Sequence, residues 1–145
     1  MKKNEITFIF DSNSENESLA RTVIAAFITR LDPTLEELAD VKTAVSEAVT
    51  NAIIHGYEGM EGKITIHSRI EDDTIWIEVC DKGVGISDIT KAMEPLYTTK
   101  PEMERSGMGF AFMEAFMDDL EVVSEEGSGT TVRMRKTIYS ALNMS

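Results

Sequence analysis

Residues 46–57 read SEAVTNAIIHGY, and this stretch places three polar side chains along one edge of a predicted helix. Glu47, Asn51 and His55 are four residues apart, so each step advances by only about 40° around the helix axis. An acid and an amide one turn apart can orient a nucleophile, and one amide oxygen can be the sole protein ligand of Mg²⁺. A solvated helix face explains the same pattern equally well, because polar residues are common on helix surfaces.

This stretch ends the second of two helices predicted in the first half of the chain. Apolar residues recur at helical spacing over 14–31 and again over 34–55. Each helix begins at a pair with capping-box spacing, Ser14 with Glu17 and Thr34 with Glu37. Asp32-Pro33 ends the first helix and Gly56 ends the second, because proline and glycine interrupt helices.

Alternation of apolar and polar residues predicts the strands. They are expected at 5–11, 64–70, 75–79, 120–124 and 131–135. A third helix is predicted to start at the glycines near 107 and to end at about 117. Since the later strands come in hairpins, we expect a mixed, mainly antiparallel sheet with the helices on one face. The predicted fold class is therefore an α/β two-layer sandwich.

Length and charge exclude several classes of function. The 145 residues suit a single domain, 1–145. Fourteen lysines and arginines against 26 aspartates and glutamates give a net charge of −12, which disfavours direct binding to nucleic acid or to anionic membranes. Cys80 is the single cysteine, so an internal disulfide is excluded and a reducing cytoplasm is expected. No apolar run approaches the roughly 18 residues of a membrane span.

Two glycine pairs follow predicted strand and loop segments. Asp81-x-Gly83-x-Gly85 comes directly after a strand, where glycines let the backbone approach a planar ring and a buried aspartate can accept a hydrogen bond from an amine. Gly107-x-Gly109 opens a helix, whose terminal amides suit phosphate. Each pair by itself is explained as well by an ordinary turn. The sequence contains no P-loop motif.

Taken together and in order, these motifs and Gly129-Thr130-Thr131 resemble the Bergerat ATP-binding fold across nearly the whole chain. The resemblance implies that Asn51 binds Mg²⁺ and that Asp81 reads the adenine amine. It assigns the other motif residues to the nucleotide as well: Gly83 and Gly85 beneath it, Gly107 and Gly109 at its phosphates, and Thr130 behind Asp81. Residues of about 86–106 correspond to the ATP lid. Further nucleotide contacts are implied for His55, Ile86, Thr98, Thr99, Ser106 and Met108.

The wording of residues 14–21, 46–57 and 95–110 is similar to the anti-sigma F factor family of endospore-forming bacteria. The resemblance implies a dimeric protein that inhibits a sigma factor and, as a serine kinase, phosphorylates an anti-anti-sigma factor. In-line phosphoryl transfer is then the expected mechanism, with Glu47 accepting or orienting the serine proton and Arg105 meeting the γ-phosphate. Arg21 is implied to contact the protein partner.

Two other functions stay open at this point. A non-catalytic, ATP-gated binding module would use the nucleotide only to set its affinity for a partner. A stress-response anti-sigma kinase would act on a different sigma factor. Glu47 favours a kinase, since a pure binder does not need a base.

Some conspicuous residues are expected to have structural roles. Cys80 is predicted to be a small buried residue, and Trp76 is predicted to face away from Ile75 and Ile77 on the open side of the sheet. Met113 and Met117 are expected to fill the core. The strand at 5–11 is predicted to be a sheet edge.

Overall fold

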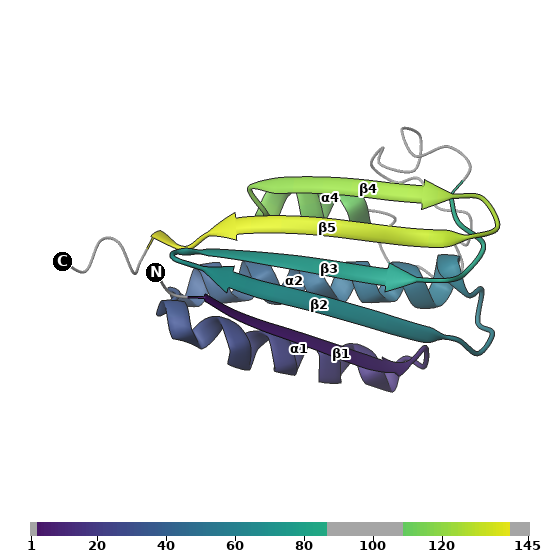
Figure 1. The fold of residues 1–145 in the computed structure, drawn as a ribbon, viewed down its shortest axis with the longest axis horizontal. Helices are drawn as coiled ribbons and strands as arrows, with labels where there is room; N and C mark the ends of the chain where they lie inside the picture. Colours follow the sequence, from purple (N-terminus) through teal and green to yellow (C-terminus); the bar gives the residue numbers. More distant parts are fainter. Residues whose placement is uncertain (1–2, 87–108, 140–145) are drawn as a thin grey trace.

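The computed structural model describes residues 3–86 and 109–139, which form one sheet with helices against one of its faces (Figure 1). The strands are β1 (Lys3–Asp11), β2 (Lys63–Glu71), β3 (Thr74–Asp81), β4 (Asp119–Glu125) and β5 (Gly129–Thr137). The helices are α1 (Glu15–Ile28), α2 (Leu35–Asn51) and α4 (Gly109–Phe116). A 3₁₀ turn (Thr29–Leu31) extends α1, and a π-helical turn (Ala52–Gly56) extends α2.

The five strands lie in the order β1-β2-β3-β5-β4, and every pairing among the described strands is antiparallel. This confirms the predicted α/β sandwich with a mainly antiparallel sheet. Among the described strands β1 also lies at one edge of the sheet, as predicted. The register places Asp81, the last residue of β3, opposite Ile64 of β2 and Thr130 of β5.

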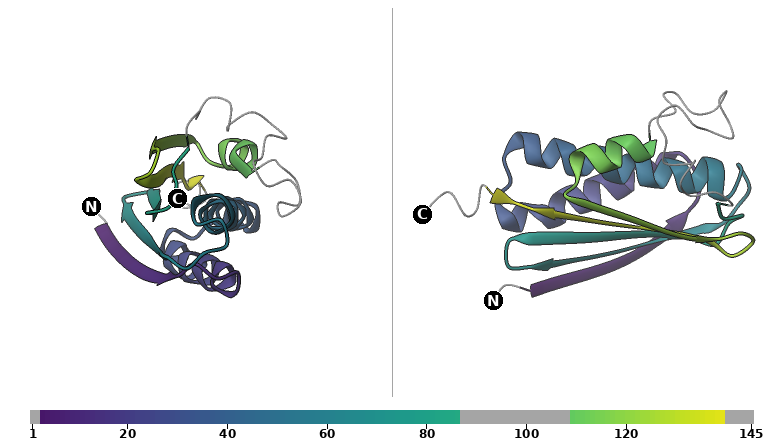
Figure 2. Two further views of the ribbon diagram at one scale, coloured as in Figure 1. Left: turned by 90° about the vertical axis from the view of Figure 1, so that its right-hand side faces the viewer. Right: turned by 90° about the horizontal axis from the view of Figure 1, so that it is seen from above.

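The core fills the space between the sheet and the three helices, which all cover the same face (Figure 2). Ile24 of α1, Val45 of α2 and Ile66 of β2 are fully buried, and burying each such side chain stabilises the fold by about 1.5–3 kcal/mol. Met113 and Met117 are also buried, as predicted. None of the helices in the described part is long and apolar enough to cross a bilayer.

The two predicted helix starts differ. Thr34 forms the predicted capping box: its hydroxyl accepts the Glu37 amide at 3.1 Å, and the Glu37 carboxylate accepts the Thr34 amide at 2.8 Å. The predicted box at Ser14 is wrong, because Ser14 already has helical backbone angles (φ −62°, ψ −24°) and its side chain makes no capping bond. Asn13 stands one residue earlier, and its side chain accepts the Asn16 amide at 3.3 Å.

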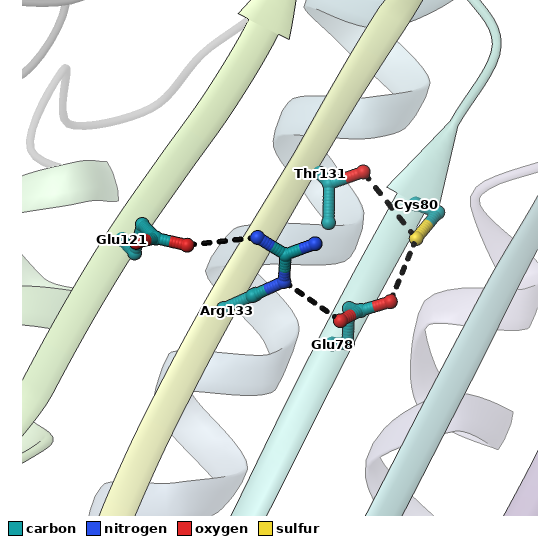
Figure 3. Close-up of polar contacts among 5 residues, drawn as sticks. All are labelled: Glu78, Cys80, Glu121, Thr131 and Arg133. Atoms are coloured by element: carbon teal, nitrogen blue, oxygen red, sulfur yellow. Dashed lines mark hydrogen bonds and ion pairs between the residues drawn. The ribbon is translucent and has the colours of Figure 1, made fainter.

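Polar side chains cover the other face of the sheet. Trp76 lies there as predicted, with the Arg69 guanidinium 4.1 Å from its ring centroid. The prediction that Cys80 is buried is wrong, because Val79 and Asp81 face the core and alternation turns Cys80 to the open face. Its sulfur lies 3.6 Å from Glu78, which also accepts a bond from Arg133 (Figure 3). Partial burial raises the pKa of the Cys80 thiol.

Candidate functional site

The candidate site lies at the end of the sheet where β3 ends, β5 begins and α2 passes into its π-helical turn (Figure 1). Gly56 closes that turn directly over the last residue of β3. A Cβ built on Gly56 would stand 2.8 Å from Cγ and 2.9 Å from both carboxylate oxygens of Asp81. Only glycine therefore lets the turn approach this carboxylate so closely.

The prediction of an α-helix through residue 55 is wrong in its last turn. The α-helix ends at Asn51, and the Tyr57 amide then donates to the Ala52 carbonyl at 3.0 Å, five residues back. Such π-helical turns are rare and frequently occur at functional sites. His55 lies in this turn and is half-buried.

The backbone after β3 is clamped against the same turn. The Val84 amide donates to the Gly56 carbonyl at 2.8 Å. A Cβ on Gly83 would overlap with that carbonyl oxygen and would lie 2.8 Å from the Gly56 Cα. Backbone therefore packs on backbone here, and any side chain at position 83 would separate the two segments.

The same segment runs along the turn between β4 and β5. Gly85 has φ +77°, and a Cβ there would overlap with the carbonyl of Glu125. The Val84 carbonyl accepts the Gly127 amide at 2.7 Å. Glycine is thus required at positions 83 and 85 because other backbone segments approach them closely. At position 85 it is also favoured by the left-handed backbone conformation.

Asp81 is the buried acid of the site. It is 9% exposed, and its Oδ1 accepts the Gly83 amide at 2.9 Å. Burial raises the pKa of this carboxyl, while hydrogen bonds from the backbone of Gly83 and Thr130 oppose that shift. An ionised carboxylate held in so dry a place is a strong acceptor for an N–H donor.

The raised pKa of Asp81 leads to a prediction for stability. Because the pKa of Asp81 is higher in the folded state than in the unfolded state, losing this proton costs more free energy in the folded state. Ionisation of Asp81 therefore destabilises the fold at neutral pH. Asp81→Asn, which keeps the acceptor for Gly83, is therefore expected to raise the melting temperature of the ligand-free protein at pH 7. The gain should shrink as the pH falls through the pKa of the folded state.

Thermal unfolding monitored by circular dichroism over a series of pH values from 7 down to 4 checks this expectation. Asp119→Asn is the matched control, because that side chain is 70% exposed on β4. A lower melting temperature for Asp81→Asn at pH 7 would contradict the sign of the effect.

A second group of residues gathers where α2 faces the start of α4. A Cβ on Gly109 would lie 3.1 Å from Asn51 Nδ2 and 3.2 Å from Glu47 Oε2. The structure therefore brings together Glu47, Asn51 and Gly109, three of the predicted site residues. The Asn51 Nδ2 atom is buried and has no hydrogen-bond partner among the described residues. A buried N–H donor without an acceptor lowers the stability of the fold unless a ligand accepts its hydrogen bond.

Other predicted residues fall elsewhere. Thr130 is buried beside Asp81, and Ile86 is the last described residue of the segment after β3. Arg21 lies in the middle of α1, with its guanidinium 3.5 Å from the Glu17 carboxylate. Nearly all of the predicted lid lies outside the described ranges. So do the remaining predicted site residues, which are Thr98, Thr99, Arg105, Ser106, Gly107 and Met108.

The sequence reasoning missed two residues that support the site. Tyr57 donates its hydroxyl proton to the Lys63 carbonyl and accepts the Lys82 amide at 2.8 Å, which ties the loop after β3 to β2. Ser124 of β4 accepts the Ile86 amide at 2.7 Å and lies 2.7 Å from the Thr130 hydroxyl. Tyr57 is the last residue of the SEAVTNAIIHGY stretch, whereas no local pattern distinguishes Ser124.

Known sequences of one kind match most of this chain. The profile of the "Histidine kinase-like ATPase domain" family matches residues 10–136. The chain is 59% identical over 136 residues to the anti-sigma F factor of Clostridium acetobutylicum, covering 94% of this chain and 95% of that protein. It is 62% identical to the anti-sigma F factor of a Thermoanaerobacter species, with 94% of both chains covered. The anti-sigma F factor of Halalkalibacterium halodurans is 54% identical, with 92% of both covered.

A solved structure shares the fold. The RsbU and RsbW domains of a Mycobacterium tuberculosis protein superpose with a TM-score of 0.66 at 18% identity. The match covers 93% of this chain and 32% of that longer chain. At this identity the likeness bears on the arrangement of helices and strands.

Proposed function

The chain belongs to the anti-sigma F factor family of histidine kinase-like ATPase domains, and from this premise we propose that it is an ATP-dependent anti-sigma factor. In this proposal it inhibits a sporulation sigma factor and phosphorylates the corresponding anti-anti-sigma factor on a serine. The observation that carries the nucleotide part is the buried Asp81 carboxylate beneath a backbone that only glycines allow.

The adenine ring and the phosphates of ATP bind at two different parts of the proposed site. The adenine amine donates to Asp81, while Gly83 and Gly85 let the backbone lie against the ring. The phosphates lie near the start of α4, where backbone amides at the helix N-terminus favour anions. They would lie beside Gly109 and the Asn51 Nδ2 atom, which has no hydrogen-bond partner among the described residues.

Mg²⁺ fits the same corner of the site. A single amide oxygen with water and phosphate oxygens is a usual coordination for this ion, and Asn51 is the residue that would hold it. Bound Mg²⁺ would neutralise charge on the phosphates. Thr98, Thr99, Ser106, Gly107 and Met108 remain our proposed further nucleotide contacts, and residues of about 86–106 our proposed lid.

The proposed reaction is in-line transfer of the γ-phosphoryl group. The partner serine oxygen forms a bond to the γ-phosphorus while the bond to the bridging oxygen of ADP breaks. Glu47 takes the serine proton, and Arg105 stabilises charge on the transferred group. Glu47 stands beside Asn51 at the start of α4, so base and phosphates meet at one place.

Protein contacts complete the proposal. Arg21 has a side chain 38% exposed on α1, where we place part of the partner-docking surface. Among the described strands none lies on the outer side of β1, and a sheet edge of this kind suits pairing with a second copy in a homodimer. We place the protein in the cytoplasm with its sigma factor.

Phosphate transfer to a partner is the deciding experiment. The purified chain is incubated with Mg-ATP and candidate anti-anti-sigma proteins, and phosphoserine on the partner is measured by mass spectrometry, with EDTA as the metal-free control. Transfer that EDTA abolishes supports the proposal. ATP-dependent binding of a sigma factor without any transfer would instead favour a nucleotide-gated binder. Transfer only to a stress-response antagonist would identify a kinase for another sigma factor.

A further inference from the structure

Ser124 joins three segments around the base of the site through one hydroxyl. It is half-buried in β4, where its Oγ accepts the Ile86 amide at 2.7 Å. The same oxygen lies 3.1 Å from the Gly129 carbonyl and 2.7 Å from the Thr130 hydroxyl. These contacts connect the segment after β3 with the beginning of β5.

The three contacts limit where the two hydroxyl protons can lie. A serine hydroxyl has one proton and two lone pairs, and a carbonyl oxygen can only accept. All three contacts are hydrogen bonds at the same time only if Ser124 donates to Gly129 and accepts from Ile86 and from Thr130. In this fully bonded arrangement the Thr130 proton points to Ser124.

Thr130 then presents only lone pairs in the remaining directions. Asp81 stands directly opposite it in the register, and the backbone of Thr130 also hydrogen-bonds the Asp81 carboxyl. Both residues are buried, at 9% and 8% exposure for Asp81 and Thr130. The site thus holds two acceptors side by side, and a ligand group with two N–H donors satisfies both.

We propose that Ser124 is a specificity-determining positioning residue that makes Thr130 an acceptor and so selects 6-aminopurine over 6-oxopurine nucleotides. This inference rests on the proposed function, in which ATP binds at Asp81. A 6-amino group offers two N–H bonds to the acceptor pair. The oxygen of a 6-oxo group would instead point its lone pairs at the acceptor oxygens of Asp81 and Thr130. Buried polar groups without a hydrogen-bond partner weaken binding.

Without Ser124, the Thr130 hydroxyl can rotate and donate its proton to a 6-oxo group. The test compares ATP with inosine triphosphate, which has oxygen in place of the 6-amino group and a proton on the neighbouring N1. Isothermal titration of wild type and Ser124→Ala with each nucleotide gives the ratio of the two affinities. We expect Ser124→Ala to lower the preference for ATP by about tenfold, the effect of one hydrogen bond of about 1.4 kcal/mol.

Three further variants make the test specific. Ser68→Ala is the matched control, because Ser68 is a fully buried strand serine whose hydroxyl donates to the Trp76 carbonyl at 2.8 Å. Ser124→Thr keeps the hydroxyl and should keep the wild-type ratio. Ser124→Cys keeps the size but bonds weakly through its thiol, so it repeats the test if Ser124→Ala does not fold.

The outcomes separate this inference from the proposed function. Equal loss of affinity for both nucleotides in Ser124→Ala, or the same fall in the ratio for Ser68→Ala, would overturn the role of Ser124 while leaving ATP binding in place. Wild type that binds neither nucleotide would overturn the proposed function, and this inference with it.

Discussion

Glu47→Gln is expected to slow phosphoryl transfer to the partner serine by about 10²–10⁴-fold, the usual contribution of a general base, while ATP still binds. The amide keeps the size of the carboxylate but cannot take the serine proton. Glu47 lies beside Asn51 and Gly109 where the phosphates are proposed, so the reacting serine would meet it there. Single-turnover transfer with saturating Mg-ATP and partner isolates this chemical step, and titration with a nonhydrolysable ATP analogue measures binding.

The control for this prediction lies on the same helix. Glu36 is an exposed residue in the first turn of α2, so Glu36→Gln makes the same chemical change away from the site. It should transfer phosphate at the wild-type rate. If Glu47→Gln also transfers at that rate, Glu47 is not the base. If it loses ATP binding as well as transfer, its role is structural.

Gly83→Ala is expected to destabilise the fold by about 1–3 kcal/mol, the usual cost of forcing a methyl group into a packed place, and to abolish measurable ATP binding. The added Cβ would overlap with the Gly56 carbonyl oxygen, which is rigid backbone and already accepts the Val84 amide. Relief requires the loop after β3 to move away from the π-helical turn. Because Asp81 lies between these segments, the movement also disturbs the proposed adenine site.

Gly59→Ala provides the contrasting case. Gly59 has φ +80°, but a Cβ there meets nothing within 4 Å, so the substitution costs only backbone strain of about 1–3 kcal/mol. We expect Gly59→Ala to lose stability yet keep ATP affinity. Urea unfolding and ATP titration of both variants make the comparison. Wild-type ATP affinity in folded Gly83→Ala would show that the close approach of the two backbones is not needed for binding.

Most of the predicted helices and strands were correct, because the patterns that define them are local. Strand alternation and helical periodicity depend on neighbouring residues, and they identified the strands and helices of the described chain within a few residues. The capping box at Thr34 was correct for the same reason. The box at Ser14 failed because Asn13, one residue earlier, offered a competing acceptor. The α-helical pattern over 34–55 could not reveal the π-helical turn, whose hydrogen bonds differ by a single residue.

The sequence by itself determined the α/β sandwich and the order of the motifs, because periodicity and motif spacing are properties of short stretches. Tertiary structure alone decided which backbone segments are in contact and which hydroxyls form hydrogen bonds with each other. Gly83 meets Gly56 only after β3 packs under the end of α2, and Ser124 meets Ile86 across 38 residues of chain. Such contacts depend on register and on distances of a few ångströms between distant segments, and no local pattern encodes them.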